Sequence, residues 1–336
     1  MRAEVAEALG PQTPVLPVPG REDSMLIRYP GPPTDLLSLR TVVAVFAALS
    51  FDVPRPRSLS SGEYFPQIVD AVRASAQLDG ARAFRFEAAG RDSTVFQHLA
   101  AQLAAATRLV HTEAAGSTDA ADGAVVLRFR RTPTLAEGWD VLVRLGSRPS
   151  SARAWRVADY PGAVNATIAA AIVRLVEVHA SDRVVNLMCG SGTLLIERLL
   201  AGPAARAVGV DLSGEAIAAA AANLGAAGLM PRAELITADM RSEQWRSDAR
   251  FDLVLADPPW GTLVGTHASN EDVHRDLLRV AHEITIPGAR MAVLTHEVRL
   301  MERLLRESDR WTERSVVRVF QKGHHPRVYL LNRVDR

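Results

Sequence analysis

After Pro161 the sequence alternates between short apolar runs and helical stretches rich in Ala and Leu, and this rhythm restricts the fold more than any other feature. The apolar runs cover residues 184–188, 207–210, 233–237, 251–256 and 291–295. Strands that alternate with helices pair in parallel and form a doubly wound sheet. We therefore expect residues 161–336 to form an α/β domain with a Rossmann-like sheet, whose strand ends share one ligand-binding edge.

The first half of the chain shows a different pattern, typical of a smaller α+β region. Residues 1–24 are rich in Ala, Glu and Pro, and we expect them to be a flexible lead-in. Residues 25–147 hold the predicted α+β region, and residues 148–160, which include Pro149, are predicted to be a linker. Within this region we expect helices from residue 64 and over 94–109, and strands over 83–88, 124–130 and 139–145. The apolar run 41–49 is compatible with either a buried strand or a short helix.

A glycine-containing turn follows the first strand of the predicted sheet. The strand 184–188 runs into Cys189-Gly190-Ser191-Gly192-Thr193 and then into a helix over 194–200. Glycines at such a turn let the backbone approach a ligand, and the helix N-terminus offers free N–H groups.

Two carboxylates stand at the ends of the next strands. Asp211 comes about 20 residues after the glycine turn, the spacing at which a carboxylate meets a ribose hydroxyl pair, and Asp239 ends the third strand. The third glycine of a dinucleotide fingerprint is replaced by Leu195, which favours S-adenosylmethionine over a cofactor with a pyrophosphate. The competing interpretation is structural: Asp211 would cap the following helix and Asp239 would stabilise a turn.

The fourth strand ends at Asp257-Pro258-Pro259-Trp260-Gly261. Two prolines stiffen the loop and remove two N–H donors, so its carbonyls and the carboxylate can only accept hydrogen bonds. Acceptors that bind both protons of an aromatic amine favour attack by the nitrogen and stabilise its developing charge. An aromatic ring beside them stacks on a base. The loop therefore predicts an amino methyltransferase site, against the alternative of a Pro-rich loop followed by a core Trp.

These motifs resemble a known family. The tetrad from Asp257 to Trp260 matches the (Asp/Asn)-Pro-Pro-(Tyr/Phe/Trp) motif of methyltransferases that act on amino groups of nucleic-acid bases or of glutamine. The string NLMCGSGTLLIE, from Asn186 to Glu197, is similar to the first motif of the THUMP-domain RNA guanine-N2 methyltransferases, a TrmN-like group of UPF0020-type class I enzymes. Residues 154–175 resemble the helix that precedes this motif and closes over the cofactor. Asn186 takes the place of a commoner Asp, and Trp260 that of a commoner Tyr or Phe.

The resemblance implies an enzyme that forms N2-methylguanosine in structured RNA, tRNA above all, with S-adenosylmethionine as cofactor and no metal. Ribosomal RNA, a DNA base, a protein glutamine, or RNA binding without catalysis stay open as alternatives. A ferredoxin-like module and a THUMP domain would occupy residues 25–147. Asp257 and Pro258 would hold the amine, Pro259 would stiffen the loop, and Trp260 would stack on a flipped base. The residues expected to bind the cofactor are Asn165, Thr167, Asn186, Cys189, Gly190, Ser191, Gly192, Thr193, Asp211, Leu212, Asp239, Met240 and Asp257.

Charge and cysteine content restrict the partners. The formal net charge is +1, but seven arginines lie within residues 128–156 against Glu137 and Asp140. Arginine suits phosphate recognition, so these side chains are either an RNA contact or an ordinary solvated surface. The arginines expected to contact RNA are Arg128, Arg130, Arg131 and Arg148. The single cysteine excludes an internal disulfide, and no apolar run approaches a membrane span, so we expect a cytoplasmic protein.

Overall fold

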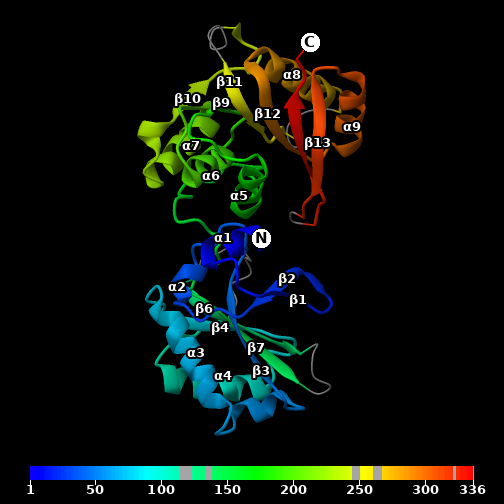
Figure 1. The fold of residues 1–336 in the computed structure, drawn as a ribbon. Helices are drawn as coiled ribbons and strands as arrows, with labels where there is room; N and C mark the ends of the chain where they lie inside the picture. Colours follow the sequence, from blue (N-terminus) through cyan, green and yellow to red (C-terminus); the bar gives the residue numbers. More distant parts are fainter. Residues whose placement is uncertain (114–122, 133–137, 244–249, 260–266, 321–322, 336) are drawn as a thin grey trace. The chain divides into compact units, whose positions relative to one another are not determined.

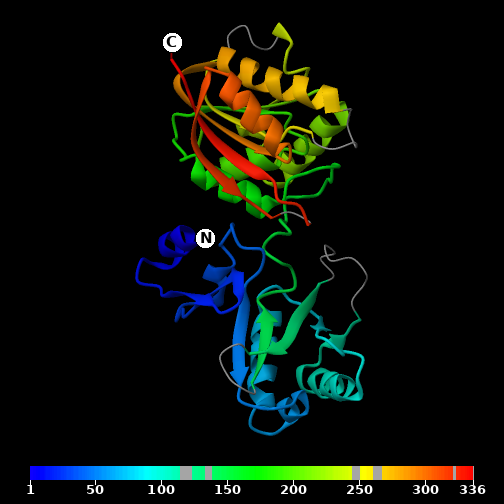
Figure 2. The same ribbon diagram turned by 90° about the vertical axis from the view of Figure 1, so that its right-hand side faces the viewer.

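The computed structural model describes residues 1–113, 123–132, 138–243, 250–259, 267–320 and 323–335. The chain divides into two compact units, Met1–Ala152 and Arg153–Arg336, which are described separately below. Figures 1 and 2 show both units as ribbons in two views.

Within the described part of the second unit, seven strands form one sheet. Five are parallel, and the other two form an antiparallel hairpin at one end. In spatial order the strands are β10 (Glu234–Thr237), β9 (Arg206–Asp211), β8 (Arg183–Leu187), β11 (Phe251–Ala256), β12 (Thr285–Thr295), β14 (Arg327–Arg333) and β13 (Trp311–Arg318). The expected doubly wound fold is confirmed, although β14 makes the sheet mixed. The strand order reverses between β8 and β11, the point at which such sheets bind ligands.

Helices cover both faces of this sheet and give three layers. One apolar core lies beneath α5, α6 and α7, and the other lies beneath α8 and α9. The helices are α5 (Ala166–Leu175), α6 (Thr193–Ala201), α7 (Gly214–Ala226), α8 (His267–Glu283) and α9 (Val298–Glu307), with a 3₁₀ turn η2 (Met230–Arg232) after α7. The central strands are buried on both sides, which explains their continuous apolar sequence.

The first unit is built on a second sheet, with five strands among the described residues. In spatial order these are β3 (Phe46–Phe51), β7 (Trp139–Arg144), β6 (Ala124–Arg131), β4 (Ala83–Glu87) and β5 (Val110–His111). The helices α3 (Phe65–Gln77) and α4 (Thr94–Thr107) pack on one face over an aromatic core, and η1 (Pro56–Ser60) precedes α3. The apolar run 41–49, which allowed two interpretations, contributes a strand.

The first 24 residues differ from the flexible lead-in that we expected. They form α1 (Arg2–Leu9) and most of a hairpin, β1 (Val15–Val18) with β2 (Arg21–Ile27), followed by α2 (Pro33–Leu36). The buried Glu4 carboxylate accepts hydrogen bonds from the backbone N–H groups of Arg40 and Thr41. Val5 packs beside it in a small apolar cluster. An acidic side chain that looked like a solvated residue thus anchors the terminus to a segment almost 40 residues away.

The boundary between the units falls inside the segment 148–160, which we expected to be a linker. From Arg153 onward this segment packs on the second unit: Trp155 is buried in the core under α6 and α7, and Arg153 pairs with the buried Glu197 at 3.0 Å. The sequence lacked periodicity there because an irregular segment, and not a helix or strand, makes these contacts. Among the described residues, no helix is long and apolar enough to span a membrane.

Candidate active site

The glycine turn connects β8 to α6 through three residues with positive φ. These are Met188 (φ 52°), Gly190 (φ 52°) and Gly192 (φ 78°), which is the N-cap residue of α6. A methionine in this region is strained, and such strain persists at functional sites. An added Cβ on Gly192 would lie 3.2 Å from the Ala220 side chain, so the turn needs glycine for space as well as for conformation.

Asp211, at the end of β9, holds this turn in place. One carboxylate oxygen accepts the Gly190 N–H at 2.8 Å, and the other accepts the Ser213 N–H at 3.0 Å. A carboxylate offers about four acceptor positions, so each oxygen keeps a lone pair for a ligand hydroxyl. The two interpretations of this residue are compatible: Asp211 supports the local backbone and still presents acceptors at the switch point of the sheet.

Asn186 is buried in β8 with its side chain fixed in one orientation. Its Nδ2 donates to the carbonyls of Leu255 (3.1 Å) and Leu187 (3.3 Å). Its Oδ1 is buried and has no hydrogen-bond partner among the described residues. A buried acceptor without a donor costs about 1–3 kcal/mol, which a ligand donor at this position would recover. The orphaned oxygen beside the glycine turn fits a cofactor that carries an ammonium or hydroxyl group.

The other residues expected at the cofactor site have varied surroundings. Asn165 caps α5 by accepting from the Thr167 backbone N–H (2.8 Å) and hydroxyl (2.6 Å), so these two residues serve the helix N-terminus. Leu212 directly follows Asp211 and is 71% exposed. The remaining expected residues of the turn, Cys189, Ser191 and Thr193, are buried, and burial raises the pKa of the Cys189 thiol.

Asp239 is already engaged by a cation. Arg241 donates to both of its carboxylate oxygens, at 2.6 Å and 2.9 Å, and this hydrogen bonding holds the pKa of Asp239 below its ordinary value. The adjacent Met240 is buried in the core of the sheet. Asp239 thus lies at the strand end that we expected, as half of an ion pair.

A buried asparagine that we did not single out from the sequence connects three parts of the site. Asn223, on α7, accepts the backbone N–H groups of Val157 and Ala158 (2.9 Å each) and donates to the carbonyls of Ala158 (2.9 Å) and Ser191 (3.1 Å). The glycine turn is therefore tied to the segment that opens the second unit. The signal in the sequence was a single amide directly after the alanine-rich stretch 216–222.

Asp257 comes directly after β11, on the other side of the switch point from the glycine turn. Desolvation raises the pKa of its carboxyl group to about 7. Pro258 is buried and Pro259 is partly exposed, while Trp260 lies outside the described residues. A carboxyl group that titrates near neutrality at such a position is suited to accept a proton as well as a hydrogen bond.

Polar side chains from β12 and α8 meet at the same edge of the sheet. Because Ala256 pairs with Val293, continuation of the register places Thr295 beside Pro258. The buried His274 ring contacts the Thr295 hydroxyl at 2.9 Å, and Asn270 donates to Glu297 at 3.3 Å. These residues form a polar wall next to the loop that begins at Asp257. Sequence patterns alone did not predict that they lie close together.

The expected RNA-binding arginines are partly committed to the first unit itself. Arg128 donates to Glu87 at 2.5 Å, and Arg130 pairs with Asp140 at 3.2 Å. We expected both to face solvent, but the Arg130 side chain is only 22% exposed because Asp140 lies directly across the strand pair. Arg131 is exposed over the Trp139 ring, and Arg148 is exposed just before the end of the unit.

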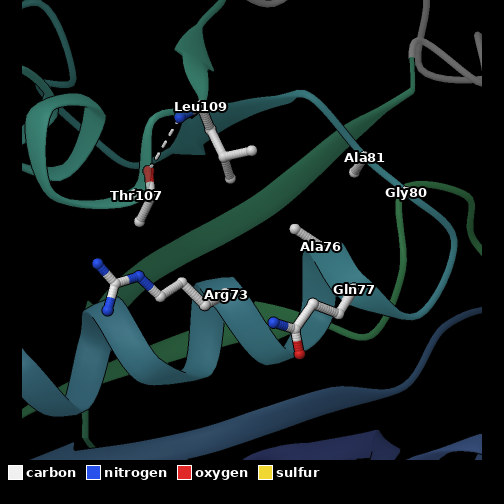
Figure 3. Close-up of a pocket in the computed structure, with 7 residues that line it drawn as sticks. All are labelled: Arg73, Ala76, Gln77, Gly80, Ala81, Thr107 and Leu109. Atoms are coloured by element: carbon white, nitrogen blue, oxygen red, sulfur yellow. Dashed lines mark hydrogen bonds between the residues drawn. The ribbon is translucent and has the colours of Figure 1, made fainter.

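A cavity of about 290 Å³ also lies in the first unit, beside α3 and the segment after α4 (Figure 3). Its wall includes Arg73, Gln77, Thr107 and Leu109, and the Leu109 N–H donates to the Thr107 hydroxyl. None of the residues predicted to carry chemistry belongs to this cavity. The candidate active site is the carboxyl edge of the large sheet.

Comparison with known proteins agrees with this placement. Residues 153–327 match the family described as UPF0020, the RMKL-like methyltransferase domain. The chain belongs to this family. The match begins at the first residue of the second unit and includes the glycine turn, Asp211 and the catalytic loop.

Relatives of this RMKL-like methyltransferase include two tRNA-modifying enzymes. A tRNA (guanine(10)-N2)-dimethyltransferase of Methanothermobacter thermautotrophicus is 30% identical over 48% of this chain and 46% of its own. A tRNA (guanine(6)-N2)-methyltransferase of Thermus thermophilus is 31% identical over 57% and 56%, respectively. The chain thus spans about half the length of the curated relatives it matches. The crystal structure of TrmN from Thermus thermophilus superimposes with a TM-score of 0.67 at 25% identity, covering 92% of this chain and 89% of that one.

Proposed function

We propose that this protein transfers a methyl group from S-adenosylmethionine to the exocyclic N2 amine of a guanosine in tRNA. The observation that carries the proposal is Asp257, a desolvated carboxyl group at the switch point of a methyltransferase sheet, followed by two prolines. The guanine-N2 methyltransferases among the relatives supply the substrate class.

On the cofactor side, the chain offers complementary groups for a nucleoside with an amino-acid tail. The Asp211 carboxylate would accept the ribose hydroxyls, and the orphaned Asn186 Oδ1 would accept from an ammonium group. The exposed Leu212 would cover part of the adenine ring. S-adenosylmethionine, when bound, supplies an electrophilic methyl group on a sulfonium centre.

On the substrate side, Asp257 and the carbonyl of Pro258 would accept the two protons of the guanine amine. This arrangement orients the nitrogen lone pair and stabilises the positive charge that develops on it. One proton must leave the amine after transfer, and a carboxylate oxygen of Asp257 with a pKa near 7 is suited to take it. The proposed work of the chain is orientation, charge stabilisation and removal of this proton.

Recognition of folded RNA falls to the first unit in this proposal. Arg131 and Arg148 are exposed, whereas the guanidinium groups of Arg128 and Arg130 already pair with carboxylates. We assign phosphate contacts to Arg131 and Arg148, with which no carboxylate pairs among the described residues, and a structural role to the paired Arg128 and Arg130.

The test is incubation of the purified protein with isotopically labelled S-adenosylmethionine and bulk tRNA from a strain that lacks the gene, followed by mass spectrometry of the nucleosides. We expect labelled N2-methylguanosine from tRNA. Label in ribosomal RNA, DNA or protein, with none in tRNA, would contradict the proposal and select an alternative substrate.

One variant separates catalysis from cofactor binding. Asp257→Ala should lose more than nine-tenths of the transfer rate, of the order expected when an acceptor of the transition state is removed, and keep its cofactor affinity. A rate above one tenth of wild type would show that Asp257 does not hold the amine.

A further inference from the structure

The hairpin of β13 and β14 ends in an aromatic pair that the proposed chemistry does not use. Phe320 is 66% exposed, the most exposed phenylalanine among the described residues. Its ring lies 5.4 Å from the His325 ring, at an angle of 56°. We call Phe320 and His325 the hairpin pair. Phenylalanine rings are usually buried, so a ring that is left in water calls for a partner.

The register of the sheet places the hairpin pair at the edge that carries the catalytic loop. β14 runs antiparallel to β12 and starts at Arg327, opposite Thr295, the last residue of β12. The joined end of β13 and β14 therefore lies beyond the carboxyl ends of β11 and β12 (Figure 1). A contact confirms this, because the rings of His296, after β12, and His324 are 5.6 Å apart.

The distance from the catalytic loop decides what the hairpin pair can contact. Three strand spacings separate β11 from β13 in the sheet, roughly 14 Å at about 4.8 Å each. A base held by Asp257 cannot reach that far, but the RNA strand on either side of it can. The pair is thus placed for a neighbouring nucleotide and not for the target guanine.

The charge around the hairpin pair suits a nucleic acid. Arg318, the last residue of β13, is exposed two residues before Phe320, and among the described residues no ion pair engages it. Arg327 is neutralised by Glu302 of α9. An exposed ring beside an uncommitted guanidinium is the combination that binds single-stranded RNA, with a base on the ring and a phosphate on the cation.

We propose that the hairpin pair stacks on a base that flanks the target guanosine and so holds the substrate strand while the target lies in the site. This inference rests on the proposed RNA substrate and adds a binding position that lies outside the catalytic loop and outside the first unit. Stacking needs only the flat face of a base, so the position favours an unpaired nucleotide of any identity.

The experiment compares Phe320→Ala, Phe320→Trp and Leu200→Ala in the full-length protein. Leu200 is a matched control, because it is 38% exposed at the end of α6, on the opposite edge of the sheet. With bulk tRNA as substrate, Phe320→Ala should raise KM about tenfold or more, with kcat and cofactor affinity within twofold of wild type. Phe320→Trp should restore the wild-type KM, and Leu200→Ala should leave it unchanged. An unchanged KM in Phe320→Ala, or a loss that Phe320→Trp does not rescue, would overturn the inference.

A second readout is independent of methylation. Binding of a fluorescently labelled single-stranded RNA oligonucleotide to Phe320→Ala should weaken by a similar factor, while the dependence of its affinity on salt keeps the wild-type slope because no phosphate contact is lost. If wild type methylates no RNA, the proposed function fails, and this binding assay still tests the hairpin pair. Equal RNA affinity in Phe320→Ala and wild type would then refute stacking on its own.

Discussion

Replacing Asp257 by asparagine keeps the shape of the side chain and removes a group whose ionisation opposes folding. The carboxyl pKa rises from 3.8 to about 7 in the folded chain because desolvation penalises the charged form. The folded state therefore binds more protons than the unfolded state between these values, and stability falls as pH rises through this interval. Each unit of pKa difference corresponds to about 1.4 kcal/mol. Ionisation of Asp257 therefore lowers the free energy of unfolding of wild type by at most about 4 kcal/mol above pH 7.

The expected result is that Asp257→Asn and wild type are about equally stable at about pH 3.5, below the unfolded-state pKa, and that the variant is more stable by up to about 4 kcal/mol at pH 8. Urea unfolding followed by tryptophan fluorescence measures this in the second unit, since four of the five tryptophans lie after residue 152. Glu215→Gln serves as the control, because Glu215 is an exposed carboxylate in the first turn of α7.

The reasoning is refuted if the stability difference between Asp257→Asn and wild type does not change with pH, or decreases as pH rises. Adding S-adenosylmethionine should reduce the difference at pH 8, since a sulfonium charge nearby favours the ionised carboxylate. The transfer rate of wild type should rise with pH through about 7 as the carboxylate forms.

Further substitutions test the proposed cofactor turn and the first unit. Asp211→Ala should weaken cofactor binding by about one to two orders of magnitude in calorimetry, as for a lost charged hydrogen bond, and equal affinity would place the ribose elsewhere. Asn223→Ala should destabilise the second unit by roughly 2–4 kcal/mol in urea unfolding, because it removes one buried and three partly buried hydrogen bonds to backbone groups, and a loss below 1 kcal/mol would show that water replaces the amide. Arg131→Ala and Arg148→Ala should each reduce the slope of log RNA affinity against log salt concentration by about one released counterion. Arg128→Ala should leave this slope unchanged. A reduced slope in Arg128→Ala alone would show that Arg128, and not Arg131 or Arg148, contacts a phosphate.

The sequence predicted the second unit well because its signals are local. Each buried parallel strand is a continuous apolar run, and the turn after β8 needs glycine at two positions with positive φ. Hence the strands could be predicted in their order along the chain, with the glycine turn, Asp211 and Asp257 at strand ends, whereas the spatial order of the strands could not.

The errors concern side chains whose partners are distant in the sequence. Glu4 looked like a residue of a flexible tail, but its carboxylate is satisfied by backbone groups of residues 40 and 41. Arg130 looked solvated, but Asp140 lies across the sheet from it. The alternation of apolar and polar residues along a strand shows which face a side chain occupies. It does not show which charged residue lies opposite it on the neighbouring strand. For the same reason, the Asn223 contacts and the polar wall after β12 became visible only in three dimensions.

The Asn223 amide also has a consequence for communication along the chain. Arg153 is the first residue of the second unit, and Val157 and Ala158, four and five residues later, share Asn223 with the glycine turn. If RNA docks on the first unit as proposed and changes the path of the backbone at the unit boundary, Asn223 would transmit this change to the proposed cofactor turn. Coupling between two binding events is reciprocal, so the cofactor should alter RNA affinity by the factor with which RNA alters cofactor affinity. Under the proposed function, the amide that stabilises the turn would then also couple binding of the substrate to binding of the cofactor.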